Sequence, residues 1–327
     1  MKMSQIGEDS FIERIRETMA SNLAEGVMGI GDDCAVIPLE KDRLMLLSTD
    51  SLIEGCHFIK DKISGRDLAY KAVMVNVSDI AAMGGRGLYI LMSIAMPKET
   101  EESWVSDYVE GMKEACDEVG IAVIGGDTTG SKEGIFINFT IVGEVLKNRV
   151  KYRKGAKEGD VICITGVIGD ALAGYEMMMK GEIGSSLFEK YCRPKAQFKE
   201  GEWLGGESSV TAMMDISDGL VQDLTRMMKA SVCGAEVDLE QIPLSEAFRE
   251  FARKHKWSAE EKAITSGEEY CLLLTVDSAK YKVLSEEFEK QFGRSLYVIG
   301  TVNEGLGVNF TKKGQKVKIE SEGYVHF

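Results

Sequence analysis

The sequence predicts an α/β fold made of two domains, and three observations support this. First, apolar runs of strand length alternate with segments whose apolar residues recur at helical spacing, as in α/β domains. Second, the chain has 327 residues, more than one hydrophobic core usually holds, so two domains of roughly 150 residues each are expected. Third, clusters of Asp, Ser and Thr follow several apolar runs, where α/β proteins place ligand groups.

Composition excludes several classes of function. The net charge is -14, and such an acidic chain lacks the cationic surface that nucleic-acid binding needs. No run of about 18 apolar residues is present, so no membrane-spanning helix is expected. The N-terminal residues lack the apolar core of a secretory signal, so a cytoplasmic protein is expected. An anionic substrate would need local Lys and Arg, helix N-termini or metal ions.

Cysteine and histidine usage narrows the kind of metal site. The 7 cysteines are scattered without a CxxC pair, mostly within apolar strings. We therefore expect buried thiols in a reducing compartment rather than disulfides or a zinc site. With 3 histidines, a histidine-rich metal centre is excluded.

The first half contains the elements of one α/β domain. Helical spacing of apolar residues over 10–22 predicts a helix that caps or packs on this domain. A Gly-rich turn carrying Asp32 and Asp33 then leads into an apolar strand; taken alone, the two aspartates would suit a hairpin turn. The next elements are a strand from 46 that ends in the polar residues 48–51, a helix over 66–83, a strand over 87–97, a helix over 101–119 and strands over 121–127 and 135–145.

The basic, Gly-bearing segment 147–159 marks the domain junction, which divides the chain into residues 1–148 and 149–327. Two helix starts in the second half carry polar residues that could simply be N-caps, Asp170 in one and Ser217 or Asp218 in the other. The expected elements are strands over 160–166, 210–215, 235–239, 271–276 and 296–302, helices over 171–180, 185–191, 197–205, 219–230, 244–255 and 280–292, and a terminal hairpin.

Four acidic clusters are expected to converge on one site. They are Gly31-Asp32-Asp33, Ser48-Thr49-Asp50-Ser51, residues 125–129 (GGDTT) and residues 215–219 (DISDG). Asp79, in an otherwise apolar helix, either bonds locally or faces this site, and burial cost favours the site. Carboxylates packed together repel one another, so a shared site implies a bound cation. Hard oxygen ligands suit Mg²⁺, which binds through a few carboxylates and substrate phosphates.

The chain lacks the other common machinery for moving phosphoryl groups. It has no GxSxG nucleophile, no kinase HRD and DFG set and no Walker lysine. Phosphoryl transfer here would therefore depend mainly on metal ions and positioning.

Seven blocks carry a resemblance to a known family. They are GIGDDCAVI (29–37), STDSLIEGCHF (48–58), NVSDIAAMGG (76–85), GGDTTGS (125–131), TGVIGDALAGY (165–175), MDISDGLVQDL (214–224) and GEEYCLLLTV (267–276). In this order and spacing they resemble the thiamine-monophosphate kinase family, a branch of the aminoimidazole-ribonucleotide-synthetase superfamily. The resemblance covers nearly the whole chain.

The resemblance implies a fold, a reaction and an assembly. The fold would be the two-domain α/β layout of that superfamily, with mixed sheets flanked by helices. Residues 1–148 would bind ATP and Mg²⁺ and form a homodimer, and residues 149–327 would complete the site. The reaction would be ATP-dependent phosphorylation of thiamine monophosphate to thiamine diphosphate by direct in-line transfer, assisted by several Mg²⁺ ions.

The resemblance also assigns roles to individual residues. Mg²⁺ would be held by Asp33, Ser48, Thr49, Asp50, Asp79, Asp215 and Asp218. ATP would contact Gly126, Asp127, Arg153 and Ser217, and the thiamine end would contact His57, Glu268, Glu269 and Tyr324. The candidate catalytic residues among these are Asp33, Asp50, Asp127 and Asp218. Tyr324 could stack on the thiamine rings, and Glu268 or Glu269 could pair with their cationic or amino groups.

Three positions depart from the family pattern. Glu269 replaces an aspartate, Gly130 replaces an arginine, and Gln197 replaces the arginine of an RPxPR segment. The acidic clusters are intact, so these changes bear on substrate contacts rather than on the reaction type.

Two alternatives remain at this point. Another superfamily enzyme is one, although the chain has neither a reactive Cys in an N-terminal Gly-rich loop nor a Cys-bearing tail. A non-catalytic acidic metal-binding protein is the other, and it would bind cations without transferring phosphate.

Overall fold

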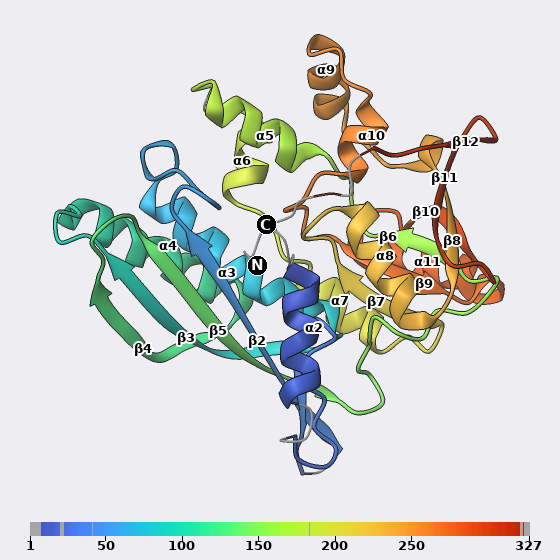
Figure 1. Cartoon of the computed structure of the whole chain (residues 1–327), viewed down its shortest axis with the longest axis horizontal. Coiled ribbons are helices and arrows are strands. Elements are labelled where there is room, and N and C mark those ends of the chain that lie inside the picture. Colours follow the sequence, from blue (N-terminus) through green and yellow to red (C-terminus); the bar gives the residue numbers. More distant parts are fainter. Residues whose placement is uncertain (1–7, 20–22, 41, 183, 321–322, 324–327) are drawn as a thin grey trace.

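Two β-sheets organise the chain, as Figure 1 shows. The structure is a computed structural model, and it describes residues 8–19, 23–40, 42–182, 184–320 and 323. One sheet has five strands in the order β1-β2-β5-β3-β4, and the other has seven in the order β12-β11-β8-β10-β6-β9-β7. Both sheets mix parallel and antiparallel pairs, as expected for the predicted α/β class.

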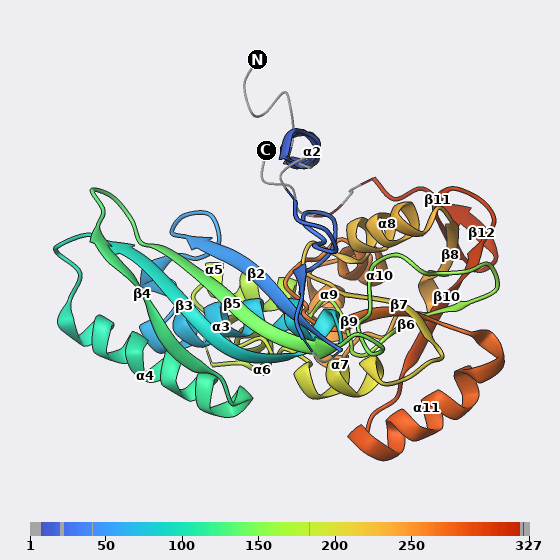
Figure 2. The ribbon, with the colours of Figure 1, turned by 90° about the horizontal axis from the view of Figure 1, so that it is seen from below.

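The five-stranded sheet is built from the first half of the chain. Its strands are β1 (Ala35–Pro38), β2 (Arg43–Ile53), β3 (Arg86–Met96), β4 (Ala122–Gly130) and β5 (Phe136–Leu146). Helices α3 (Gly65–Ala82) and α4 (Glu102–Val119) lie on one face of this sheet, and no helix of the described chain covers the other face (Figure 2).

The seven-stranded sheet is built from the second half. Its strands are β6 (Val161–Ile164), β7 (Val210–Asp215), β8 (Gly234–Asp238), β9 (Leu272–Val276), β10 (Tyr297–Asn303), β11 (Gly307–Lys312) and β12 (Gln315–Val317). The helices of this half are α5 (Asp170–Met179), α6 (Ser186–Cys192), α7 (Phe198–Gly205), α8 (Leu220–Ser231), α9 (Glu246–Lys254), α10 (Ala259–Ile264) and α11 (Ser278–Phe292). In Figure 2, α8 and α11 lie on opposite sides of the sheet. Short 3₁₀ turns occupy Lys60–Lys62 and Leu239–Gln241.

Helix α3 connects the two halves because it is apolar nearly all round and therefore buried on most of its surface. Ser64 caps its start by accepting a hydrogen bond from the Asp67 amide. The body of the helix packs into the core of the first sheet, whereas Ala81 and Ala82 at its end belong to a hydrophobic cluster of the second half, where the helix contacts α7 and β7. A Cβ on Gly201 of α7 would lie 2.3 Å from the Ala81 carbonyl oxygen, so this contact depends on glycine. The helix consequently fixes the two sheets relative to each other.

Most predicted elements are present, but several details were wrong. Strand β2 does not end at residues 48–51; it runs on to Ile53, because full antiparallel pairing with β5 continues through the polar stretch. Helix α2 (Glu8–Met19) forms, yet it does not pack on the first domain as expected, since Phe11 and Met19 are exposed. Helix α10 was not predicted.

The N-cap predicted at Asp170 was wrong, and the alternative of an N-cap at Ser217 or Asp218 does not hold either. Gly169 precedes α5 and Gly219 precedes α8, and neither helix has a side-chain cap. Glycine occupies both positions with positive φ, 98° and 112°, a backbone region that other residues rarely adopt. Asp170 and Asp218 instead accept hydrogen bonds from Ser245 and Arg226, respectively.

The division between the sheets falls between Leu146 and Val161. The predicted boundary at residues 148 and 149 lies in this connection and stays a prediction. None of the helices in the described part of the chain combines the length and the apolar composition that crossing a bilayer requires.

Candidate active site

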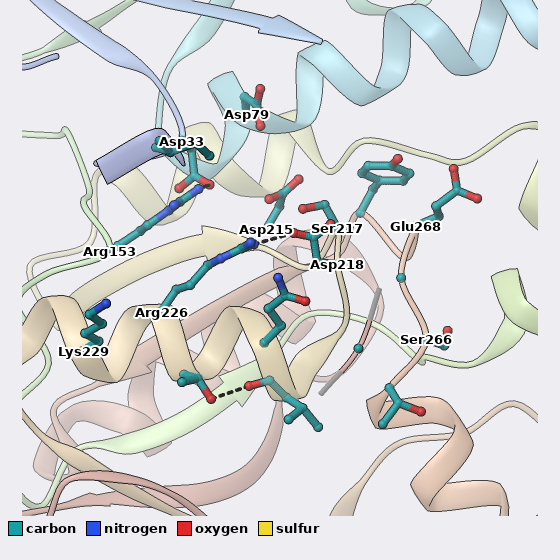
Figure 3. A pocket seen from close by; sticks show the side chains of 18 of the residues that line it. Asp33, Asp79, Arg153, Asp215, Ser217, Asp218, Arg226, Lys229, Ser266 and Glu268 are labelled. Carbon is teal, nitrogen blue, oxygen red and sulfur yellow. Dashed lines mark hydrogen bonds and ion pairs between the residues drawn. The ribbon is translucent and has the colours of Figure 1, made fainter. Parts of the chain in front are cut away.

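A cavity of about 2510 Å³ lies between the two halves of the chain. This volume exceeds the roughly 300–1,000 Å³ typical of a pocket for one small ligand, so two substrates can fit together. Its lining comes from both halves of the chain. The first half contributes α2, the turn before β1, β2 and the segment after it, and α3. The second half contributes the segment with Arg153, α5, Tyr191 of α6, the end of β7 and the segment after it, α8, the segment before β9, and β11 and β12. Figure 3 shows the acidic side of this cavity.

Three aspartates that are far apart in sequence meet in this cavity. Asp33 comes from the turn before β1, Asp79 from α3 and Asp215 from the end of β7. One carboxylate oxygen from each lies within 4.8 Å of those of the other two. Figure 3 shows the three side chains directed toward one another. The expected convergence of acidic clusters from both halves is therefore present for these residues.

Strand β2 supplies the next members of the site. Ser48 donates a hydrogen bond to Asp79 Oδ2, and both Ser48 and Asp50 line the cavity. Side chains alternate along a strand, so Thr49 faces the other side of the sheet. There its hydroxyl donates to the Phe139 carbonyl at 3.0 Å and lies 3.1 Å from the Thr140 hydroxyl. The Thr49 side chain thus lies outside the cavity of this chain.

The buried aspartates hold their protons unusually tightly. Burial raises the pKa of Asp79 well above its ordinary value, and the charges of Asp50, Asp215 and Asp33 raise it further. Burial and the charge of Asp33 likewise raise the pKa of Asp215 well above its usual range. Desolvation also raises the pKa of Asp50. Such a group of carboxylates is unfavourable unless a cation or protons offset the charge.

The chemistry of this cluster fits a hard divalent cation. The Asp33 Oδ2 atom is buried and has no hydrogen-bond partner in the described chain. A buried carboxylate oxygen without a partner is costly, so a ligand is expected there. The oxygen donors of Asp33, Asp79 and Asp215, with Asp50 and Ser48 beside them, are those that Mg²⁺ prefers.

Arg153 offsets part of this negative charge. Its Nη2 donates to Asp33 Oδ1 at 2.8 Å, and its backbone amide donates to Asp32 Oδ1 at 3.1 Å. Burial and the Asp33 charge nevertheless raise the pKa of Asp32 to about 7. Arg153 lines the cavity, where its guanidinium is well placed for a phosphate.

The loop after β7 brings Ser217 and Asp218 to the cavity. Their backbone amides both donate to Asp223 Oδ2 at 3.1 Å, so a buried side chain on α8 fixes the loop. Arg226, one turn further along α8, donates to both Asp218 and Asp223. Neither Asp223 nor Arg226 was singled out from the sequence. A signal was available: Arg226 follows Asp223 by three residues, which places the two side chains on the same face of a helix. It follows Asp218 by eight residues, so this face can turn back toward the loop that precedes the helix.

Only some of the residues expected at the thiamine end line the cavity. His57 and Glu268 do. Glu269 does not; its carboxylate accepts hydrogen bonds from the Gly169 amide and the Ser266 hydroxyl, each at 2.6 Å, and burial raises its pKa to about 8. The expectation that Glu269 contacts the substrate stays a prediction. Tyr324 lies outside the described residues.

Gly126 and Asp127 do not line the cavity either. They lie within the exposed edge strand β4, where Asp127 pairs with Ser93 of β3. Ser93 pairs with Asn138 of β5, which pairs with Ser51 of β2. Three strand spacings of about 4.8 Å place Asp127 roughly 14 Å from Ser51 within one chain. The assignment of Gly126 and Asp127 to ATP stays a prediction.

A buried lysine was also missed. Lys71 of α3 is fully buried, and its Nζ lies 2.8 Å from Glu268 Oε1. A lysine within a helix is normally exposed, so its residue type gave no reason to expect Lys71 near a buried site. The available signal was its neighbourhood, because residues 68–75 are otherwise apolar on every side of the helix.

Comparison with known proteins matches both halves of the chain to one family. Residues 31–145 match the N-terminal domain of AIR synthase related proteins, and residues 157–313 match the C-terminal domain. The thiamine-monophosphate kinase of Escherichia coli strain K12 is 32% identical over 328 residues, covering 98% of each chain. That of Aquifex aeolicus is 32% identical over 332 residues, covering 100% of each.

A solved structure agrees with these sequence relatives. The structure described as AaThiL complexed with AMPPCP and TMP has a TM-score of 0.88 and 32% sequence identity, covering 100% of this chain and 99% of that one. Sequence, fold and the arrangement of the acidic residues lead to the same classification. The chain belongs to the thiamine-monophosphate kinase family within the AIR synthase related proteins.

Proposed function

We propose that this chain phosphorylates thiamine monophosphate with ATP to give thiamine diphosphate and ADP. The observation that carries the proposal is the meeting of Asp33, Asp79 and Asp215 in a cavity between the two halves. The relatives are thiamine-monophosphate kinases, and one solved relative is described with both AMPPCP and TMP. The cavity volume suits two such ligands side by side.

The reaction needs positioning more than acid–base chemistry. An oxygen of the thiamine monophosphate phosphate forms a bond to the γ-phosphorus of ATP, and the bond from that phosphorus to the β,γ-bridging oxygen breaks, releasing ADP. The attacking oxygen is already anionic at neutral pH, so no side chain must remove a proton. The main obstacle is repulsion between two anionic phosphates in one cavity.

The acidic cluster is proposed to hold Mg²⁺, which when bound would offset this repulsion. Asp33, Asp79 and Asp215 would hold the metal, and Asp50 and Asp218 lie in the same cavity. Ser48 orients Asp79 through its hydrogen bond. Thr49 is proposed as a further metal contact on the family resemblance alone, because its side chain faces the other side of β2.

The substrate contacts are proposed from the same cavity. Arg153 and Ser217 would contact ATP, because both line the acidic side. His57 and Glu268 would contact thiamine, and a carboxylate such as Glu268 suits the cationic thiazolium ring. A contact of Glu269 with thiamine is proposed from the family resemblance alone. Tyr324 remains a proposed stacking partner for the thiamine rings.

A direct assay tests the proposal. The purified chain with Mg²⁺ and ATP is expected to convert thiamine monophosphate to thiamine diphosphate, detected by chromatography together with one equivalent of ADP. Unphosphorylated thiamine is the control acceptor and should give no diphosphate. ATP hydrolysis without thiamine diphosphate would favour another superfamily reaction. Cation binding with neither product would leave only a metal-binding protein.

We also propose a homodimer formed through the uncovered face of the five-stranded sheet. Apolar side chains are exposed there, including Ile53 (44%), Tyr89 (46%) and Leu91 (38%). Contiguous exposed apolar surface is typical of an interaction site. On the edge strand β4, Val123 and Ile124 are also exposed. A second copy on this face would cover β4, and in that arrangement Gly126 and Asp127 could complete an ATP site.

The dimer is tested by light scattering after gel filtration. The chain is expected to elute with twice the mass of one copy. Leu91→Asp should shift it toward the monomer, because a carboxylate would be buried in the interface. Leu306→Asp is the matched control: Leu306 is 79% exposed on the turn between β10 and β11, and its replacement should leave the mass unchanged. A wild-type monomer at micromolar concentration would refute the proposed dimer.

We place the protein in the cytoplasm. None of the seven cysteines forms a disulfide within the described chain, and five of them are buried. Unpaired cysteines are typical of reducing compartments.

A further inference from the structure

A buried cation lies behind the part of the cavity where thiamine is proposed to bind. Lys71 has no exposed surface, and its Nζ contacts two groups: Glu268 Oε1 at 2.8 Å and the ring of Tyr191, whose centroid is 3.7 Å away. Burying an ammonium is costly unless such partners offset the charge. Lys71 cannot itself reach a ligand, so any effect it has on binding must pass through these partners.

The Glu268 backbone is held in an uncommon conformation. Its φ is 63°, and that of Tyr270 is 50°, a region that non-glycine residues seldom occupy. The Glu268 amide donates to the Ser217 carbonyl at 2.7 Å, and the Tyr270 amide donates to the Ile216 carbonyl at 2.8 Å. Backbone strain of this kind persists only where the surroundings enforce it, and it is common at ligand sites. The segment thus presents the Glu268 side chain to the cavity, where it is 29% exposed.

Tyr191 connects the same lysine to the other expected thiamine contact. Its hydroxyl donates to the His57 carbonyl oxygen at 3.2 Å, and the His57 ring accepts a hydrogen bond from the Ile53 amide at 3.1 Å. Tyr191 is buried on α6, in the second half of the chain, whereas His57 follows β2 in the first half. Lys71 therefore lies at the junction of three segments: α3, α6 and the segment before β9.

We infer that Lys71 and Tyr191 are positioning residues that hold Glu268 and His57 in place for the thiamine end of the substrate. This inference rests on the proposed function and names a part of its site. Lys71 forms an ion pair with one carboxylate oxygen of Glu268 and so fixes the carboxylate, while the other oxygen remains available to a ligand in the cavity. Fixing a ligand-contacting charge in advance strengthens binding, because less freedom is lost when the substrate arrives.

The test separates recognition of thiamine monophosphate from recognition of ATP. Lys71→Met keeps the side-chain length and removes the charge, and it is expected to raise the KM for thiamine monophosphate about tenfold while the KM for ATP changes less than about twofold. Tyr191→Phe removes only the hydroxyl and should raise the KM for thiamine monophosphate about threefold. Equal increases in both KM values, or no increase in either, would overturn the inference.

A double-mutant cycle shows whether Lys71 acts through Glu268. Lys71→Met combined with Glu268→Gln should be no worse than the more damaging single change, because both remove the same interaction. Glu268→Gln alone should lower the Tm, since it leaves a buried ammonium without its counter-charge, and adding Lys71→Met should restore it. If the double variant raises the KM for thiamine monophosphate by the product of the two single effects, Lys71 and Glu268 act independently, and the inference is overturned.

Lys151 provides the matched control. It is a part-buried lysine whose Nζ donates to two backbone carbonyls, of Glu207 at 2.7 Å and Val210 at 3.0 Å, outside the cavity. Lys151→Met should lower the Tm without changing either KM. If Lys71→Met does not fold, Tyr191→Phe decides: an unchanged KM for thiamine monophosphate overturns the inference.

Failure of this inference can be distinguished from failure of the proposed function. If the wild-type chain forms no thiamine diphosphate, the proposed function fails. Binding of thiamine monophosphate measured by calorimetry then decides the inference. Weaker binding in Lys71→Met than in Lys151→Met would support it, and no binding to the wild-type chain would overturn it.

Discussion

Asp79→Asn is expected to lower kcat by about a hundredfold to a thousandfold, the range seen when one preorganised electrostatic group is removed from an active site. Asp79 is the member of the cluster with the most acidic neighbours: Asp50, Asp33 and Asp215 all contribute to its raised pKa. Removing its charge would weaken cation binding at the centre of the site. Steady-state assays at saturating Mg²⁺ and ATP measure the effect.

The same substitution should stabilise the chain when divalent cations are removed. With chelator present, Asp79→Asn removes one carboxyl group from a cluster whose members repel one another when they are ionised. The thermal unfolding midpoint should rise by about 2–4 °C for each kcal/mol of repulsion relieved, or somewhat less for a chain of this length. Loss of activity with a gain in stability separates a functional residue from a structural one.

Asp160→Asn is the matched control for this prediction. Asp160 is as buried as the cluster residues, but it lies outside the cavity, where it accepts hydrogen bonds from the Lys157 amide and the Thr211 hydroxyl. Its replacement should lower the unfolding midpoint and change kcat less than about threefold. Turnover of Asp79→Asn within threefold of wild type would show that the metal-site assignment is wrong.

The second large effect is a dependence of metal-free stability on pH. Burial raises the pKa of Asp32 and of Asp223 from 3.8 to about 7, and neighbouring charges add to both shifts. The pKa values of Asp79 and Asp215 are raised in the same direction. Between about pH 4 and these raised values, the folded chain therefore binds more protons than the unfolded chain.

The sign of the effect follows from this difference in bound protons. A state that binds more protons is favoured as the pH falls, so in chelator the unfolding free energy should increase as the pH is lowered from 8 to 6. Each extra proton contributes about 1.4 kcal/mol per pH unit. Saturating Mg²⁺ should raise the midpoint at pH 8 and flatten the pH profile, because cations then replace protons at the carboxylates.

Thermal unfolding followed by circular dichroism between pH 6 and 8, with chelator or with Mg²⁺, measures both effects. Asp79→Asn should show a shallower pH profile in chelator, and Asp160→Asn should keep the wild-type slope. Stability that falls from pH 8 to pH 6 in chelator, or identical profiles with and without Mg²⁺, would contradict the proposed cation site.

The regular elements could be predicted from the sequence because their physical causes are local. The buried runs that became β3 and β5 and the helical periods that became α3 and α4 lie within two residues of their expected limits. The end of β2 could not be predicted in this way. Its polar residues 48–51 indicate a strand end when read alone, whereas pairing with β5 keeps them extended.

The sequence predicted that the candidate site would be acidic, but it predicted only some of the residues that form it. Asp33, Asp79 and Asp215 were all expected, and the structure brings them together. The resemblance implied substrate contacts for Glu268 and Glu269 alike, yet only Glu268 lines the cavity, whereas the Glu269 carboxylate accepts a hydrogen bond from the Gly169 amide. Adjacency in sequence does not decide which side chain faces a cavity.

By itself, the sequence determined the α/β class, the approximate elements, the acidic character of the site and, through its motifs, the family, because each of these depends on residue identity and local spacing. Only the tertiary structure decided which carboxylates share a cavity, that Thr49 turns away from it, and that Lys71 is buried behind Glu268. The orientation of Thr49 depends on the pairing of β2 with β5. The other two outcomes depend on how α3 packs between the two halves, which joins residues separated by more than a hundred positions. No local pattern can specify contacts over such a separation.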